Sequence, residues 1–351
     1  MWWLALVRLA GAGAHVVSPA YTGNCQSPAW SQDGSKLAYE VNYHDKKIIE
    51  LHVYDVLKGT ERRIRPLTRG QSSLTQGFDV ARESVAHEVS WGPTSIGRFV
   101  YSASTDGHDY DLFIDGSGAV APAPGTDGGA AWSPNGRSIA FTSARSGEGD
   151  LYLLDVDRID GPPKQLTSKP DTSELFAAWS PIGKSLAYVS HSRQGDNLYV
   201  IDNVDKPDAR RVTFWEGTQT RPSWSPDGKL IAFYSNHESA TRFDLSIVPA
   251  AGGEPTLLAS GVVMSTHGPS WTPDGRSIVF VKDDDARYDP LWIVPVATPA
   301  SAQAVASDTV GNGDLDVVKA ADGKIWVAIA AQGLAGDEVR DFKRVYVLEL
   351  E

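Results

Sequence analysis

The sequence contains a single cysteine, Cys25, so it has no internal disulfide and no metal site built from several cysteines. No apolar run reaches the roughly eighteen residues that a membrane-spanning helix needs, so we expect no membrane span. Basic residues are outnumbered: 32 Lys and Arg stand against 44 Asp and Glu, for a net charge of −12. Nucleic acid is bound through clustered Lys and Arg, so we do not expect it as a partner.

Motifs of common catalytic sites are also missing. The sequence has no G-x-S-x-G, no phosphate-binding loop, no dinucleotide fingerprint, no H-x-H and no H-E-x-x-H. Each of these motifs fixes a nucleophile, a phosphate or two metal-binding imidazoles at a set spacing. Their absence favours a protein that binds without catalysing a reaction.

The sequence does contain a repeat. Segments such as "SPAWSQDGSKLAYEV", "RPSWSPDGKLIAFYSNH" and "GPSWTPDGRSIVFVKDD" share one pattern. After a first interval of 61 residues the repeat recurs every 41 to 47 residues, which is the length of a four-stranded propeller blade. Seven units centre on Trp30, Trp91, Trp132, Trp179, Trp224, Trp271 and Val318.

Each unit divides into four expected strands. The residues before Trp form the first strand, and "SPDG" forms a tight turn, in which Pro presets φ and Gly accepts a positive φ. Alternating residues such as "KLIAFYS" form the second strand, and a polar loop leads to the third and fourth. We expect each repeated Trp to pack between neighbouring blades, with a sugar-stacking platform as the alternative.

The pattern W-SPDG-K-IAF-S followed by LY resembles the TolB-like propeller repeat, a relative of the WD repeat, over nearly the whole chain. This resemblance implies an all-β fold, a seven-bladed β-propeller of four-stranded antiparallel blades, with residues 1–351 as one domain. The α/β domain that precedes the propeller in the Tol–Pal protein has no counterpart in the sequence. The resemblance also implies a periplasmic or secreted protein and a scaffold for binding.

The opening "MWWLALVRLAGAGAHVVS" raises the choice between a signal peptide and a first strand. Arg8 interrupts the apolar run that a signal peptide needs. Leu4–Ser18 also aligns without a gap to 245–259 in the fifth unit, so we interpret it as strand. Val16–Ser18 then completes the last blade, which N- and C-terminal strands share, because an unpaired edge is avoided in closed β-folds. Leu4–Leu9 and Val345–Leu350 both remain candidates for its third strand.

The loops that precede the first strand and follow the second strand of each blade are expected at one mouth of the central channel. The positions four before each Trp, and the matching position of the seventh unit, are Gln26, His87, Gly128, Leu175, Thr220, His267 and Asp314. The candidate catalytic residues are His87 and His267, at these positions, and Glu88 and Arg221, which lie next to them. The candidate metal ligands are His87, His267 and Asp314. Candidate ligand-binding residues in the other loops are His44, His108, His191, Arg193, His237 and Arg287.

Two functions follow from this arrangement. The first is a non-catalytic propeller, a monomer without a cofactor, that binds a protein, peptide or glycan at the channel mouth. The alternative is a metal-assisted polysaccharide lyase or hydrolase that uses a divalent metal at the same mouth. Oligogalacturonate lyases, which resemble this chain, carry such a metal and a cationic residue there.

Overall fold

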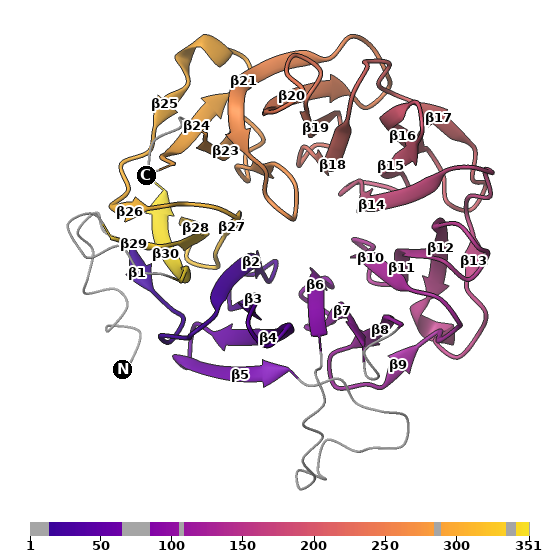
Figure 1. Cartoon of the computed structure of the whole chain (residues 1–351), viewed down its shortest axis with the longest axis horizontal. Coiled ribbons are helices and arrows are strands. Elements are labelled where there is room, and N and C mark those ends of the chain that lie inside the picture. The colour runs from indigo at the N-terminus through magenta and orange to yellow at the C-terminus, as the bar shows by residue number, and fades with distance from the viewer. Residues whose placement is uncertain (1–13, 65–84, 105–108, 284–288, 335–341, 351) are drawn as a thin grey trace, which may run out of the picture.

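The computed structural model describes residues 14–64, 85–104, 109–283, 289–334 and 342–350, and nearly all regular structure within them is strand. The strands form seven units around a ring (Figure 1), which agrees with the seven repeats. The helices of these residues are two short 3-10 turns, η1 (Val156–Arg158) and η2 (Pro299–Ser301). No helix in the described ranges has the length and apolar character to cross a membrane. The expected all-β propeller is confirmed.

Blades 1 to 4 are separate antiparallel sheets whose strands follow chain order from the centre of the ring outward (Figure 1). Blade 1 comprises β2 (Asn24–Trp30), β3 (Lys36–Tyr43), β4 (Ile48–Asp55) and β5 (Thr60–Ile64). Blade 2 comprises β6 (Val85–Trp91), β7 (Phe99–Ser104), β8 (Asp111–Ile114) and β9 (Ala119–Val120). Blade 3 comprises β10 (Asp127–Trp132), β11 (Ser138–Ser143), β12 (Asp150–Asp155) and β13 (Lys164–Gln165). Blade 4 comprises β14 (Ser173–Trp179), β15 (Leu186–Ser192), β16 (Gly195–Ile201) and β17 (Ala209–Arg211).

Blades 5 and 6 are joined into one eight-stranded sheet, because the long strand β21 also pairs with β23. Blade 5 comprises β18 (Gln219–Trp224), β19 (Leu230–Ser235), β20 (Phe243–Pro249) and β21 (Thr256–Val263). Blade 6 comprises β22 (Ser270–Trp271), β23 (Ser277–Lys282), β24 (Leu291–Pro295) and β25 (Gln303–Ala304). Blade 7 comprises β27 (Leu315–Lys319), β28 (Ile325–Ala331), β30 (Arg344–Leu350) and β1 (His15–Val16), and β26 (Thr309–Val310) pairs with β29 (Gly333–Leu334) in a separate ribbon.

The repeated tryptophans pack between blades, as expected. Trp224, for example, is 9% exposed and lies in a core cluster with Val189 and Leu198 of blade 4. Its indole Nε1 donates a hydrogen bond to the carbonyl of Ala178, one residue before the blade 4 tryptophan, at 2.9 Å. The indoles of Trp91, Trp179 and Trp271 make the same bond to Ala29, Ala131 and Ser223 of the preceding blade. These side chains therefore serve packing rather than sugar stacking.

The turns after Trp224 and Trp271 have the expected glycine with a positive φ. The hydroxyl of Ser225 donates to the carboxylate of Asp227 at 2.7 Å, and Gly228 closes the turn with φ of +69°. Thr272 and Asp274 repeat the same bond at 2.7 Å. A Cβ on Gly228 would lie 2.6 Å from the exposed side chain of Ile182 in the preceding blade, which would have to move, and the positive φ favours glycine there.

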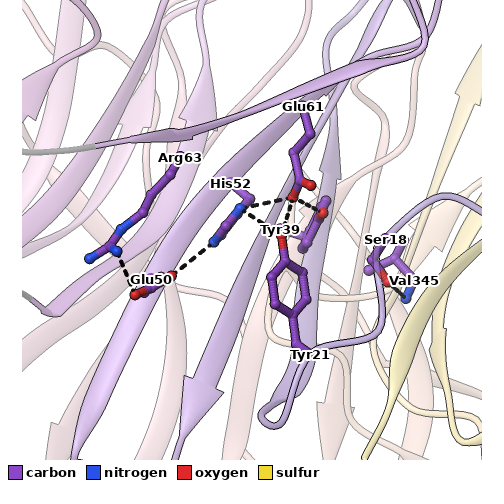
Figure 2. A network of polar contacts seen from close by, with 8 residues as sticks. All are labelled: Ser18, Tyr21, Tyr39, Glu50, His52, Glu61, Arg63 and Val345. Atoms are coloured by element: carbon purple, nitrogen blue, oxygen red, sulfur yellow. Dashed lines mark hydrogen bonds and ion pairs between the residues drawn. The ribbon is translucent and has the colours of Figure 1, made fainter.

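Strands from both ends of the chain complete blade 7, as the sequence predicts. β1 pairs with β30, the backbone N–H of Val17 donates to Val345 O at 2.9 Å, and the N–H of Val345 donates to Ser18 Oγ at 3.0 Å (Figure 2). β30 pairs in turn with β28, so Arg344–Leu350 is the third strand of the blade. The competing segment Leu4–Leu9 lies outside the described residues.

The segment that follows β1 is also tied to blade 1 by a polar network around His52 (Figure 2). The hydroxyl of Tyr21 donates to Glu61 Oε1 at 2.8 Å, and the hydroxyl of Tyr39 donates to the same oxygen. His52, 5% exposed, lies with Nδ1 2.8 Å from Glu61 and Nε2 3.2 Å from Glu50. Burial would raise the pKa of Glu61, but hydrogen bonds from His52, Tyr39 and Tyr21 outweigh it and lower that pKa.

The inter-blade indole bond can be tested with a matched pair of substitutions. Trp224→Phe removes the bond to Ala178, whereas Trp30→Phe removes an indole N–H that is buried without a partner in the described structure. The two side chains are similarly buried, at 9% and 7% exposed. We expect Trp224→Phe to lower the free energy of unfolding by about 1–3 kcal/mol more than Trp30→Phe does, measured by urea denaturation. Equal losses would contradict a stabilising role for the bond.

The network around Glu61 predicts a pH-dependent contribution to stability. Because the folded pKa of Glu61 is lowered, its contribution is fully present above the unfolded value of about 4.3 and is lost as the pH falls through the folded pKa. Glu61→Gln should reduce the free energy of unfolding by about 1–3 kcal/mol at pH 7, and less below pH of about 4. Urea denaturation at both pH values checks this, and a loss independent of pH would refute it.

Candidate functional site

The innermost strands share a backbone irregularity that builds the channel wall. In blades 1 to 5 the pairing of the first two strands shifts register just before the tryptophan, which is the mark of a β-bulge. The residue three before each of the first six repeated tryptophans has a positive φ of 51° to 87°. These residues are Ser27, Glu88, Gly129, Phe176, Arg221 and Gly268. In blade 7 the pairing of β27 with β28 runs through without a shift.

The bulges of blades 1 to 5 border one pocket, with a volume of about 410 Å³. Four of the six bulge residues carry a side chain despite the left-handed backbone, which disfavours any residue with a Cβ. Such strain persists where the surrounding structure holds it, and it is frequent at binding sites. The polar and aromatic lining comprises Gln26, Ser27, Glu40, Glu88, Ser90, Tyr110, Phe176, Arg221, Thr266 and His267.

Carboxylates from neighbouring blades hold the backbone of the bulges. Glu40, 5% exposed, accepts the N–H of Glu88 at 2.9 Å, and Glu88 accepts the N–H of Gly129 at 2.6 Å. Asp314 accepts the N–H of Ser27 at 3.1 Å and that of Thr266 at 2.8 Å, one with each oxygen. The acidic groups of the site therefore connect adjacent blades around the channel.

Arg221 is the cation of the pocket. Its Nη1 donates to the carbonyl of Thr266, and its guanidinium lies over the ring of Phe176, 3.9 Å from the ring centre. Burial lowers the pKa of Arg221, and the carboxylates of Glu88 and Asp314 oppose this shift. The group stays charged at neutral pH because the ordinary pKa of arginine is above about 12.

Of the candidate catalytic and metal-binding residues, His267, Glu88 and Arg221 come together at the pocket. His267 is half-buried, with Nε2 3.3 Å from the carbonyl oxygen of Ser27 in blade 1. His87 lies in β6, but its side chain is outside the described structure. Asp314, the third proposed metal ligand, has both oxygens engaged by backbone N–H groups.

The candidate ligand-binding residues that are described lie away from the pocket. The exposed side chain of His191 forms an ion pair with Asp196 of the same blade, with 2.5 Å between Nδ1 and Oδ1. Arg193 is exposed in the adjoining turn. His237 stacks on Trp215, with 4.8 Å between ring centres. His44 is exposed in the turn between β3 and β4. His108 and Arg287 fall outside the described ranges.

Sequence reasoning missed most of the pocket lining, including Ser27, Phe176 and Glu40. Ser27 and Phe176 were overlooked because the mouth was predicted four residues before each tryptophan, whereas the bulges place it three before. Of the positions four before each tryptophan, Gln26 and His267 line the pocket, whereas Gly128, Leu175 and Thr220 do not. Glu40 carried a detectable signal, because it is a single charged residue inside the apolar strand "KLAYEV".

Metal binding finds no support in the residues whose positions are known. Within the described ranges, no group of three or more His, Cys, Asp or Glu side chains is placed to hold a metal ion. His87 is not covered by that statement, since its side chain is not described. The prediction of a metal site on His87, His267 and Asp314 remains untested.

Comparison with known proteins gives a family match. The family model described as "TolB beta propeller domain" matches residues 112–312, more than half of the chain. No curated protein matches the sequence. TolB from Acinetobacter baumannii is 20% identical over 80% of this chain, with a TM-score of 0.47, and this chain covers 54% of its length.

Other solved structures share the fold at lower identity. An oligogalacturonate lyase in complex with manganese is 14% identical, with a TM-score of 0.62, and the alignment covers 97% of this chain and 94% of the lyase. The β-propeller domain of the Trilobed protease from Pyrococcus furiosus is 11% identical, with a TM-score of 0.60, over 93% of this chain and 95% of that one. At these identities the likeness concerns the propeller alone.

The bulge geometry predicts unequal effects for two Gly→Ala substitutions. A Cβ at Gly129 (φ +58°) would meet Thr142 Oγ1 at 3.6 Å, an ordinary contact, so only the left-handed backbone is penalised. A Cβ at Gly268 (φ +87°) would lie 2.7 Å from the carbonyl oxygen of Arg221. Gly129→Ala should lower the free energy of unfolding by about 1–2 kcal/mol and Gly268→Ala by more, in urea denaturation. Equal effects would argue against the close approach of Gly268 to the carbonyl oxygen of Arg221.

Proposed function

The chain belongs to the TolB beta-propeller family, and on this premise we propose that it binds a segment of a protein, peptide or glycan at the channel mouth without catalysing a reaction there. The observation that carries the proposal is the pocket of about 410 Å³ at the bulges. Concave sites with a few fixed polar groups and an apolar lining are typical of ligand binding. This volume suits one or two residues of a chain rather than a folded domain.

The chemistry of the pocket supports binding over catalysis. Asp314 and Glu40 accept hydrogen bonds with both carboxylate oxygens, and their partners are groups of the protein itself. A catalytic base must instead accept a proton from the substrate at hydrogen-bond distance. The arrangement therefore uses its carboxylates to hold the wall that a ligand would contact.

The alternative, a metal-assisted polysaccharide lyase or hydrolase, has less support. It requires His87 and His267 to converge with a carboxylate, and Asp314 has its oxygens committed to Ser27 and Thr266. The structural likeness to an oligogalacturonate lyase is at 14% identity and speaks for the fold only. Loss of bound metal and of turnover in a His87→Ala, His267→Ala double variant would favour this alternative.

Blocking the pocket should abolish binding. His267→Trp places a larger side chain at the lining, and His44→Trp makes the same change at an exposed turn outside it. We expect ligands found on arrays of synthetic peptides and oligosaccharides to lose at least about tenfold in affinity with His267→Trp and none with His44→Trp. Thermal melting confirms that both variants fold, and unchanged affinity in a folded His267→Trp protein would place the site elsewhere.

A further inference from the structure

The guanidinium of Arg221 is held in place by its surroundings. The residue occupies the bulge of blade 5 with φ of +54°, which fixes its backbone three residues before Trp224. Its Nη1 is bonded to the carbonyl of Thr266 in the next blade, and its planar face rests on Phe176 of the preceding blade. A cation on an aromatic face is favourable, particularly where water is displaced. The group is thus oriented before any ligand arrives.

Arg221 lacks the anionic partner that other arginines of this protein have. Arg145 pairs with Asp127 at 2.8 Å, Arg62 with Asp115 at 2.6 Å and Arg210 with Asp202 at 2.9 Å. Among the described residues no carboxylate lies within ion-pair distance of Arg221, although it lines the pocket and is half-buried. Glu88 and Asp314 act on this charge only from beyond ion-pair distance, so an anion bound in direct contact with the guanidinium would stabilise it further.

We infer that the ligand is a peptide segment that places one carboxylate on Arg221 and an adjacent apolar side chain in the same pocket. This inference rests on the proposed function. The carboxylate matches the planar fork of a guanidinium, which can donate two parallel hydrogen bonds to it. Phe176 covers one face of the guanidinium, so the carboxylate approaches its edge.

The apolar part of the lining favours an aliphatic side chain over a sugar ring. It includes Val89, Ala130, Ala177 and Pro222, which offer no side-chain hydrogen bond. Each sugar hydroxyl buried against such a surface would lose its hydrogen bond to water, whereas an aliphatic side chain would gain from burial.

The acidic groups of the pocket limit the charge of the ligand. Glu40 and Glu88 line the same space as Arg221, so the pocket contains more carboxylates than guanidiniums. A polyuronate, which carries one carboxylate on every ring, would meet repulsion from both glutamates. A segment with a single carboxylate meets this repulsion only once, and direct contact with the Arg221 guanidinium opposes it.

The experiment compares small probes by ligand-observed NMR titration of the full chain. N-acetyl-leucine carries a terminal carboxylate next to an apolar side chain, and N-acetyl-leucinamide has the same shape without the charge. Acetyl-leucyl-glutamate amide presents the carboxylate on a side chain, and galacturonate presents it on a sugar. We expect the first probe to bind at least about tenfold more tightly than its amide, because a hydrogen-bonded ion pair is lost. The third probe tells whether the carboxylate is terminal or on a side chain.

Variants assign that difference to Arg221. Arg221→Gln should reduce the preference for the acid to less than about twofold, Arg221→Lys should retain part of it, and the exposed control Arg193→Gln should retain all of it. Equal binding of acid and amide by the wild-type protein overturns the inference but leaves the pocket as a binding site. Binding of galacturonate alone, or of no probe, also overturns it. If Arg221→Gln does not fold, the wild-type comparison with Arg221→Lys decides.

Discussion

The β-bulge three residues before each tryptophan is the constraint on which the site depends. It turns the innermost strand into the left-handed region at Ser27, Glu88, Phe176 and Arg221, residue types for which that conformation is strained. At Ser27, Glu88 and Gly129 a carboxylate of an adjacent blade accepts the freed N–H group, at 2.6 to 3.1 Å. Blade 7 has no bulge and contributes Asp314 to this bonding instead. The wall of the pocket is therefore a consequence of how the blades are joined.

Blade-to-blade contacts also explain how a ring of small sheets becomes stable. Each blade alone is a four-stranded sheet with two exposed faces, and burial comes from the next blade. The indole bonds from Trp91, Trp179, Trp224 and Trp271 to the preceding blade repeat one contact around the ring. The pairing of β1 with β30 and the network at His52 join the last blade to the first.

Much of the fold could be predicted from the sequence, because each blade repeats the same tryptophan and turn. The completion of blade 7 by an N-terminal strand followed from the alignment of Leu4–Ser18 with 245–259 and from the avoidance of an unpaired edge. The site was predicted less well, since hydrophobic alternation does not reveal a bulge and one inserted residue shifts every later side chain. Phe176 was missed for that reason, while His267 was found. The pairing of β21 with β23 depends on strand length and had no pattern to predict it.

The central claim is that a pre-oriented, unpaired guanidinium at the channel mouth selects the ligand. Its most direct test is a crystal structure of the protein with N-acetyl-leucine. The account predicts the carboxylate within hydrogen-bond distance of the Arg221 guanidinium, with the guanidinium still stacked on Phe176 and the leucine side chain in the apolar part of the pocket. An Arg221 side chain paired with Glu88, or the probe bound away from the channel mouth, would contradict it.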